Sequence, residues 1–154
     1  MIKPIPKKKF LQLIKFGPLI AIDLLIVNSK KEVLLGNRTN NPAINSWFVP
    51  GGCIRKNESF KEAFGRVTFN ELGMKCDFKS AKFLGVYEHF YKNNFDNKKF
   101  GTHYVVHAYK FKLKFALKKL PVEQHSKYKW FSIKSILTNK KVHTNTKNYI
   151  KLSL

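Results

Sequence analysis

One helix of this chain is delimited at both ends by the sequence itself. Ser59 is followed three residues later by Glu62, a spacing at which the two side chains cap the first turn of a helix reciprocally. The apolar residues that follow have helical spacing: Phe60, Ala63, Phe64, Val67 and Leu72. Gly73 then supplies the residue that most readily adopts the left-handed conformation ending a helix. The sequence therefore predicts a helix from about Phe60 to Leu72.

The segments around this helix predict mostly strands. Strands are expected at Leu19–Val27, Glu32–Asn37, Trp47–Val49, Phe78–Tyr91 with an irregular start, Thr102–Phe115 and Lys127–Phe131. Helices are expected at Pro6–Phe16, Ser132–Leu137 and Thr144–Leu152, and loops at Asn40–Asn45, Pro50–Gly52, Asn93–Phe100 and Leu120–Ser126. Strands in mixed order with few helices favour an α+β fold, an α/β/α sandwich around a mixed sheet. The length of 154 residues predicts a single domain over residues 1–154.

The chain is strongly basic, with 30 Lys and Arg against 9 Asp and Glu and a formal charge of +21. Such a balance attracts anions. The lysines are scattered over many predicted elements, which favours a generally lysine-rich protein over a nucleic-acid-binding arm. The apolar stretch Pro18–Val27 is short and carries Asp23, so it predicts neither a signal peptide nor a membrane span, and we expect a cytoplasmic protein. Cys53 and Cys76 form no CxxC pair and imply no disulfide framework.

Polar residues within and around the predicted helix follow a second pattern. The positions with fixed spacing are Gly52, Glu58, Arg66, Glu71 and Gly73. A capped amphipathic helix accounts for Gly73 but not for Glu58, Arg66 and Glu71. The pattern resembles the Nudix signature, a loop–helix–loop that binds a divalent metal ion and a diphosphate. The resemblance implies a metal-dependent hydrolase of a nucleoside-diphosphate compound, with a Nudix-type fold and this helix as the Nudix helix.

The helix departs from the usual Nudix pattern at two carboxylate positions. The usual sequence is Arg-Glu-apolar-x-Glu-Glu, whereas this chain has Arg66-Val67-Thr68-Phe69-Asn70-Glu71. Positions 67, 70 and 71 share one helical face, so only Glu71 would present a carboxylate there. One carboxylate suffices for a single Mg²⁺ per subunit that is bound largely through substrate, with Mn²⁺ as an alternative ion. The base that activates water must then come from another segment.

This pattern of losses resembles one branch, the GDP-mannose mannosyl hydrolases, over nearly the whole chain. The matching segments are Arg38–Ala43, Trp47–Gly52, Glu88–Tyr91, Thr102–Val106 and Glu123–His125 with Tyr128 and Trp130. The resemblance implies attack of water on C1 of the sugar, with inversion and release of GDP and mannose. It also implies a GDP-sugar as the substrate and a homodimer, with the N-terminal segment 1–17 at the interface.

The same resemblance implies a role for each matching residue. The Mg²⁺ ligands would be Glu71, Gln124 and the carbonyl of Gly51. His125 would be the general base, Arg38 and Tyr104 would stabilise the departing diphosphate, and Asp23 and His89 would lie close to the sugar or nucleotide. An inverting reaction requires a base on the face opposite the leaving group. Histidine commonly serves as a base near neutral pH, and metal plus Arg neutralises a departing diphosphate.

Each of these residues also has a structural interpretation. Asp23 would be a buried acid bonded to the backbone, Tyr104 a core residue of its strand and His125 a surface histidine. The branch usually has Arg directly after its Gly-Gly pair, where this chain has Cys53. Arg55 lies on the same side of an extended segment, and our hypothesis is that it partly substitutes as a substrate-binding residue.

Two other functions fit the sequence less well. A conventional Nudix enzyme would cleave the P–O–P linkage of a nucleotide sugar or nucleoside triphosphate, against which the two missing helical carboxylates argue. A non-catalytic module would bind nucleotide or RNA through the basic surface, against which the retention of Glu58, Arg66, Glu71, Gln124 and His125 argues.

Overall fold

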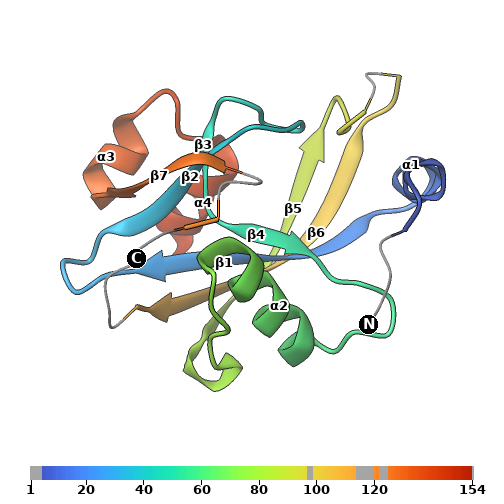
Figure 1. Ribbon diagram of the computed structural model, residues 1–154. Helices are drawn as coiled ribbons and strands as arrows, with labels where there is room; N and C mark the ends of the chain where they lie inside the picture. The colour runs from blue at the N-terminus through green and yellow to red at the C-terminus, as the bar shows by residue number, and fades with distance from the viewer. Residues whose placement is uncertain (1–4, 97–98, 114–119, 122–124, 154) are drawn as a thin grey trace.

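Within the part of the chain that the structure describes, the elements are seven strands and four α-helices, arranged as Figure 1 shows. The computed structural model describes residues 5–96, 99–113, 120–121 and 125–153. The helices are α1 (Lys7–Phe16), α2 (Phe60–Leu72), α3 (Ile133–Thr138) and α4 (Thr144–Ser153), with a short 3₁₀ turn η1 (Phe78–Ser80). The strands are β1 (Leu19–Val27), β2 (Val33–Arg38), β3 (Trp47–Phe48), β4 (Gly51–Cys53), β5 (Lys82–Tyr91), β6 (Thr102–Lys112) and β7 (His125–Phe131).

Helix α2 has the bounds that the sequence predicts. The Ser59 backbone N–H donates to the Glu62 carboxylate at 2.8 Å, and the Glu62 N–H donates to the Ser59 hydroxyl at 3.3 Å, so the capping box is complete. At the other end Gly73 has a φ of 74°, and its N–H donates to the Phe69 carbonyl at 2.8 Å. Local signals are therefore sufficient to define this helix.

The strands form one mixed sheet with the order β3-β2-β1-β6-β5, while β4 pairs with β1 and β7 pairs with β2. The central pair β1 and β6 is parallel, and the other pairs are antiparallel. On its other side β1 has two partners. It meets β2 only at Val27↔Val33, and farther back it pairs with β4, where Asp23 lies opposite Gly51. The sheet thus opens between β1 and β2, and β4 fills that opening.

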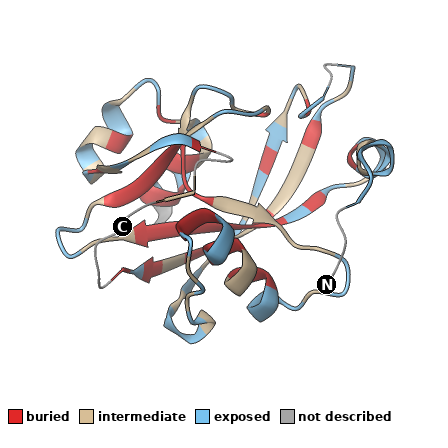
Figure 2. Ribbon diagram, in the orientation of Figure 1, coloured by how far each residue is buried: buried red, intermediate tan, exposed pale blue. Residues whose placement is uncertain are grey.

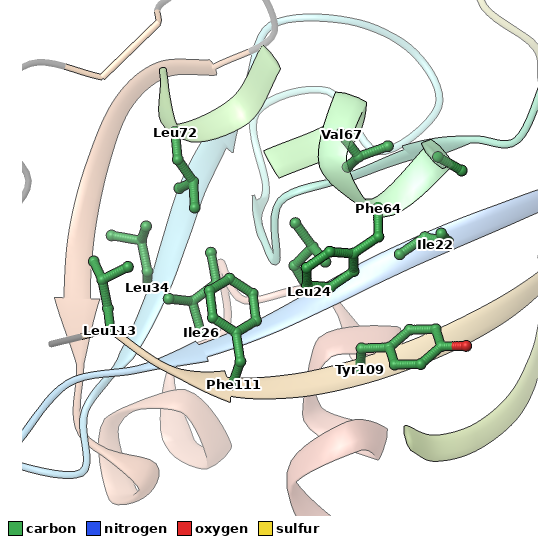
Figure 3. Close-up of a cluster of buried hydrophobic side chains, with 11 residues drawn as sticks. Ile22, Leu24, Ile26, Leu34, Phe64, Val67, Leu72, Tyr109, Phe111 and Leu113 are labelled. Carbon is green, nitrogen blue, oxygen red and sulfur yellow. The ribbon is translucent and has the colours of Figure 1, made fainter. Parts of the chain in front are cut away.

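Helices cover both faces of the sheet, as the alternation along β1 requires. Ile22, Leu24 and Ile26 pack with α2 in one cluster, whereas Leu25 packs in a second cluster with α3 and α4. Figure 3 shows the first cluster, with Phe64 of α2 directed toward the sheet. Burial is concentrated along β1 and on the inner side of α2 (Figure 2). The expected α+β fold, a mixed sheet with helices packed around it, is confirmed.

Three predicted boundaries are wrong. Pro50-Gly51-Gly52 was expected to be a loop, but Gly51–Cys53 is strand β4, because β1 offers a free edge there. His125 was expected in a loop, but it is the first residue of β7 and lies opposite Arg38 of β2. The strand predicted from Phe78 begins only at Lys82, after the 3₁₀ turn η1. Each difference depends on pairing partners that are distant in sequence.

Helix α1 lies at one side of the sheet and packs through few residues. Ile14 is buried, and the Phe10 ring lies 5.5 Å from the ring of Phe95. Leu13 and Phe16 remain exposed. Within the described part of the chain, no helix has the length and apolar character needed to cross a membrane.

Candidate active site

A cavity of about 350 Å³ opens on the face of the sheet that carries α4. Three strands contribute adjacent positions to its wall: Ala21 and Asp23 of β1, Tyr104 and Val106 of β6, and His89 and Tyr91 of β5. The wall of the cavity also includes Arg38, Phe48, Gly51, Cys53 and Phe10. Five of the predicted site residues therefore line one cavity: Asp23, Arg38, Gly51, His89 and Tyr104.

A larger hollow of about 690 Å³ lies on the outer side of α2, between Gly65 and Phe78. Of the residues singled out in the sequence signature, this hollow contains Arg66 alone, whose guanidinium is bonded to Glu58. We assign the site to the smaller cavity, because buried ionisable groups concentrate there.

Asp23 is a buried acid in the middle of an apolar strand. Burial, with a smaller effect of the nearby Glu71 charge, raises its pKa to about 7, while the hydrogen bond from Tyr149 and the charge of Arg38 oppose the shift. The Tyr149 hydroxyl donates to Asp23 Oδ2 at 2.6 Å. A side chain at Gly51 would collide with Asp23 Oδ1, so only glycine permits this close approach of β4 to the carboxylate.

His89 lies on β5 beside the same tyrosine. Its Nε2 is 2.9 Å from the Tyr149 oxygen, and its side chain is buried. Burial, with a smaller effect of His143, lowers the pKa of His89 to about 4. The imidazole is therefore neutral at physiological pH and serves as a hydrogen-bonding group rather than as a cation.

Arg38 supplies the positive charge of the cavity. Its Nε is buried and has no hydrogen-bond partner among the described residues, and its guanidinium lies 5.9 Å from the centre of the Phe48 ring. Tyr104 and Tyr91 pack edge to face at 5.9 Å, and burial raises the pKa of Tyr104, as it raises that of Tyr91 to about 12. Both phenols thus keep their protons as donors, and with Arg38 they form a site suited to an anion.

Glu71 and His125 contact each other, and neither is among the residues that line this cavity. Glu71 Oε2 lies 3.2 Å from His125 Nδ1, and the side chains are 2% and 1% exposed. The geometry is not that of a hydrogen bond, and Glu71 Oε2 and His125 Nε2 have no hydrogen-bond partner within the described ranges. The Tyr128 hydroxyl oxygen lies 3.2 Å from His125 Nδ1. A side chain at Gly36 would collide with the imidazole, so glycine is required beneath the ring.

The donors around Glu71 fit a hard cation. A buried carboxylate oxygen without a hydrogen-bond partner is costly unless a ligand completes it, and Mg²⁺ and Mn²⁺ prefer oxygen ligands. The repulsion between Glu71 and Asp23 also favours a cation between or near them. Gly51 lies opposite Asp23, whereas Gln124 is outside the described residues. The described ranges contain no group of three His, Cys, Asp or Glu residues that could hold a metal ion.

The start of the Nudix-like segment is held by an ion pair. Arg66 donates from Nε to Glu58 Oε1 at 2.6 Å and from its terminal nitrogen to Glu58 Oε2 at 2.8 Å. The same nitrogen donates to the Cys53 carbonyl at 2.7 Å, and the Arg55 N–H donates to Glu58 Oε2 at 2.9 Å. These bonds lock the loop between β4 and α2 onto the helix and fix where Gly51 lies relative to Glu71.

The structure brings together most, but not all, of the predicted residues. Arg55 does not line the cavity, whereas Cys53 does, and burial raises the pKa of its thiol to about 11. His125 contacts Glu71, and it is buried in the sheet rather than exposed in a loop. Among the cavity contacts, sequence reasoning missed Tyr149, which touches two site residues from the last helix. No local pattern distinguishes it from a core tyrosine.

Comparison with solved structures gives the same fold. The MutT NUDIX hydrolase of Burkholderia pseudomallei superposes with a TM-score of 0.72 at 21% identity, over 90% of this chain and 99% of that chain. The MutT protein of Methanosarcina mazei Go1 gives 0.66 at 23% identity, over 87% and 91%. The NUDIX domain of Shewanella oneidensis NrtR, solved with ADP ribose, gives 0.68 at 18% identity, over 97% of both chains.

Sequence comparison agrees. A curated relative, the low-salt glycan biosynthesis protein Agl8 of Haloferax volcanii, is 41% identical over 87 residues, which are 56% of this chain and 54% of the relative. This chain thus spans about half the length of that relative. The family model of the NUDIX domain matches residues 17–152, nearly the whole chain. The chain therefore belongs to the NUDIX domain family.

Proposed function

We propose that the protein is a divalent-metal-dependent hydrolase of a GDP-sugar, with GDP-mannose as the leading candidate. Membership of the NUDIX domain family supports a hydrolase. In the proposed reaction, water attacks C1 of the sugar, the bond between C1 and the diphosphate oxygen breaks, and GDP and mannose of inverted configuration leave. The name of the relative Agl8, a glycan biosynthesis protein, is consistent with a sugar-containing substrate.

The observation that carries the proposal is the contact between Glu71 and His125. A carboxylate and an imidazole, both almost fully buried, lie 3.2 Å apart at the end of α2, and one nitrogen of the imidazole has no partner within the described ranges. At the two other positions where the usual Nudix helix carries a carboxylate, this chain has Val67, packed in the core, and Asn70, so neither position supplies a base. His125 is therefore the group that we propose takes the proton from water.

The cavity has the composition that a nucleotide sugar needs. Arg38, with Tyr104 as a neutral donor, would bind the diphosphate and stabilise the charge that develops as it leaves. Asp23 and His89 would bind the sugar or nucleotide through hydrogen bonds. A volume of about 350 Å³ is at the lower end of the range for small-molecule sites, so part of the substrate would lie outside it.

A metal ion would be held by Glu71 and the Gly51 carbonyl, and we propose Gln124, outside the described residues, as a further ligand. Bound there, Mg²⁺ or Mn²⁺ would supply a Lewis acid for the diphosphate. The loop bonds from Arg66 hold Gly51 in place. Cys53, which lines the cavity, stands where the mannosyl hydrolases usually have arginine, and we propose that Arg55 partly substitutes for that arginine.

The test is product analysis in ¹⁸O-labelled water. Incubation with GDP-mannose and Mg²⁺ is expected to release GDP and mannose, with the label on C1 and the released anomer, read by NMR, inverted relative to the substrate. Label on phosphate, with GMP and mannose-1-phosphate as products, would instead establish conventional P–O–P cleavage. Turnover of no nucleotide sugar, together with steeply salt-dependent binding of RNA, would point to the non-catalytic module.

Two variants make this test specific. Glu71→Gln removes the proposed metal ligand and is expected to abolish Mg²⁺-dependent release of GDP. Glu62→Gln is its matched control on the same helix, because this exposed residue forms only the capping box, which glutamine also completes. Equal loss of activity in both variants would indicate damage to the helix rather than loss of a ligand.

The homodimer implied by the resemblance also remains a proposal. Exposed Leu13 and Phe16 on α1 give the N-terminal segment an apolar surface for such a contact. Sedimentation equilibrium of the full chain would measure the stoichiometry.

A further inference from the structure

Tyr149 occupies an unusual place at the base of the cavity. Its side chain is 1% exposed, and it belongs to α4, on the last part of the described chain. Its hydroxyl lies 2.6 Å from Asp23 Oδ2 on β1 and 2.9 Å from His89 Nε2 on β5. One phenol thus joins two strands that are separated in the sheet by β6. Both of its partners line the cavity, although Tyr149 itself is packed in the cluster beneath.

We infer that Tyr149 is a positioning residue of this site, whose hydroxyl ties Asp23 to His89 and fixes the His89 imidazole as the tautomer with its hydrogen on Nε2. A phenol hydroxyl has one hydrogen to donate, and its oxygen accepts. The Tyr149 hydroxyl donates its hydrogen to Asp23 Oδ2. The Tyr149 oxygen must then accept from His89 Nε2–H.

The state of His89 makes the tautomer matter. Burial keeps its imidazole neutral at physiological pH, so the ring carries a single nitrogen-bound hydrogen. With that hydrogen on Nε2, Nδ1 is left with a lone pair and can only accept. A sugar hydroxyl is a donor that suits such an acceptor, and this step of the argument rests on the proposed function. Without Tyr149 the imidazole could adopt either tautomer, and the tautomer with its hydrogen on Nδ1 would present a donor instead of an acceptor.

Packing around Tyr149 holds the phenol in place. The Tyr87 ring meets it edge to face at 4.7 Å, and Phe48 lies edge to face with His89 at 5.9 Å. Helix α4 makes a second contact with the cavity, where Asn145 donates to the Tyr91 hydroxyl at 3.2 Å. Helix α4 therefore forms hydrogen bonds with two side chains of β5, His89 and Tyr91, although none of its own residues was expected to belong to the site.

The first test measures the tautomer without any turnover. In the ¹⁵N-labelled full chain at pH 8.5, the His89 ring nitrogens are expected to show Nε2 protonated and Nδ1 bare. The signals are assigned by their disappearance in His89→Gln. In Tyr149→Phe, which keeps the packing ring, the two nitrogens are expected to shift toward an averaged value. A wild-type protein with Nδ1 protonated, or an unchanged pattern in Tyr149→Phe, would overturn the inference.

The second test is kinetic and uses Tyr87→Phe as the matched control. The Tyr87 ring packs against that of Tyr149, so the control removes the same atom from a neighbouring ring without breaking the hydrogen bonds of Tyr149 to Asp23 and His89. Tyr149→Phe is expected to raise KM for the GDP-sugar about tenfold, the loss of one hydrogen bond, with a smaller change in kcat. Equal KM values in Tyr149→Phe and Tyr87→Phe would refute the positioning role. If no nucleotide sugar is turned over, the proposed function fails, while the NMR measurement still decides the tautomer.

Discussion

The carboxylates at the two ends of helix α2, Glu58 and Glu71, differ in their hydrogen bonding. Before the first turn, Glu58 receives two hydrogen bonds from Arg66 and a third from the Arg55 backbone, and the bonds from Arg66 are the main reason that its pKa is lowered. In the last turn, Glu71 is at least as buried, yet its Oε2 has no hydrogen-bond partner in the described ranges. One carboxylate is satisfied within the protein, and the other is left for a ligand.

This difference separates structural from functional charge within one motif. A buried charge without a partner destabilises a fold, so it persists where binding or chemistry requires it. The ion pair of Glu58 and Arg66 holds the loop that carries Gly51. The Glu71 carboxylate lies beside His125. Asp23 shares some of these features with Glu71: it accepts a hydrogen bond from Tyr149, but its carboxylate is buried, lies near Glu71 and has a raised pKa. Carboxylates of the two kinds should therefore respond differently to substitution.

Removal of the unsatisfied carboxylate should have the largest effect. Glu71→Gln keeps the shape of the side chain but removes the charge that would hold the cation, so kcat/KM for GDP-mannose should fall by roughly 10³-fold, as expected for several kcal/mol of lost charge stabilisation. Because the variant also removes an uncompensated buried charge, its thermal midpoint should not fall. Steady-state kinetics over a range of Mg²⁺ concentrations checks the first part and circular dichroism the second. Unchanged Mg²⁺ dependence would end the assignment of Glu71 as a ligand.

His125 should come next, since it contributes a proton transfer rather than the ion site. His125→Gln should lower kcat by roughly 10²-fold and leave KM almost unchanged, because a general base acts in the transition state. His103→Gln is a suitable control, because His103 lies on β6 rather than on β7. Its ring stacks on that of Phe90 with the ring centres 4.3 Å apart. A rise in KM without a fall in kcat would show that His125 binds substrate or supports the fold and does not act as a base.

The two ends of α2 also differ in how far the sequence predicted them. The helix bounds, the capping box and Gly73 followed from local signals and are confirmed. The Nudix pattern correctly identified the family, and it singled out Glu58, Arg66 and Glu71. It did not show that Glu58 and Arg66 bond to each other while Glu71 stays unbonded, because that division depends on how the loop from Cys53 folds back onto the helix.

The sheet side of the site was harder to predict. Asp23 and His89 were identified by resemblance alone, since a single acid or imidazole in an apolar strand has no local signature of function. Tyr149 lies 126 residues from Asp23 and 60 from His89, so only the packed fold brings the three together. The strand assignment of His125 was missed for the same reason, because β7 is defined by its register with β2.

At the satisfied end, the expected effect is on stability. Glu58→Gln should lower the free energy of unfolding by about 2 kcal/mol at pH 7, because Arg66 loses a charged partner in a partly buried site. The folded-state pKa of Glu58 lies below its unfolded value, so this contribution is present above pH 4.5 and is lost as the pH falls through the folded value. Urea unfolding of the wild type and the variant at pH 7 and pH 3 measures it. A difference between the two proteins that does not shrink at pH 3 would contradict the ion-pair explanation.

Asp23 should give the smallest effect on stability, with the opposite sign. Its folded pKa of about 7 lies above the unfolded value of 3.8, so the folded state binds the proton more tightly, and the free energy of unfolding should fall as the pH rises between these values. Asp23→Asn removes the buried charge and leaves an oxygen that accepts from Tyr149, so it should stabilise the protein by roughly 1 kcal/mol at pH 8 and by less at pH 5. The comparison requires this gain to accompany a loss of turnover, since an acid kept at the expense of stability must serve the reaction. A variant that is destabilised at pH 8 would show instead that the Asp23 carboxylate stabilises the fold, as that of Glu58 does.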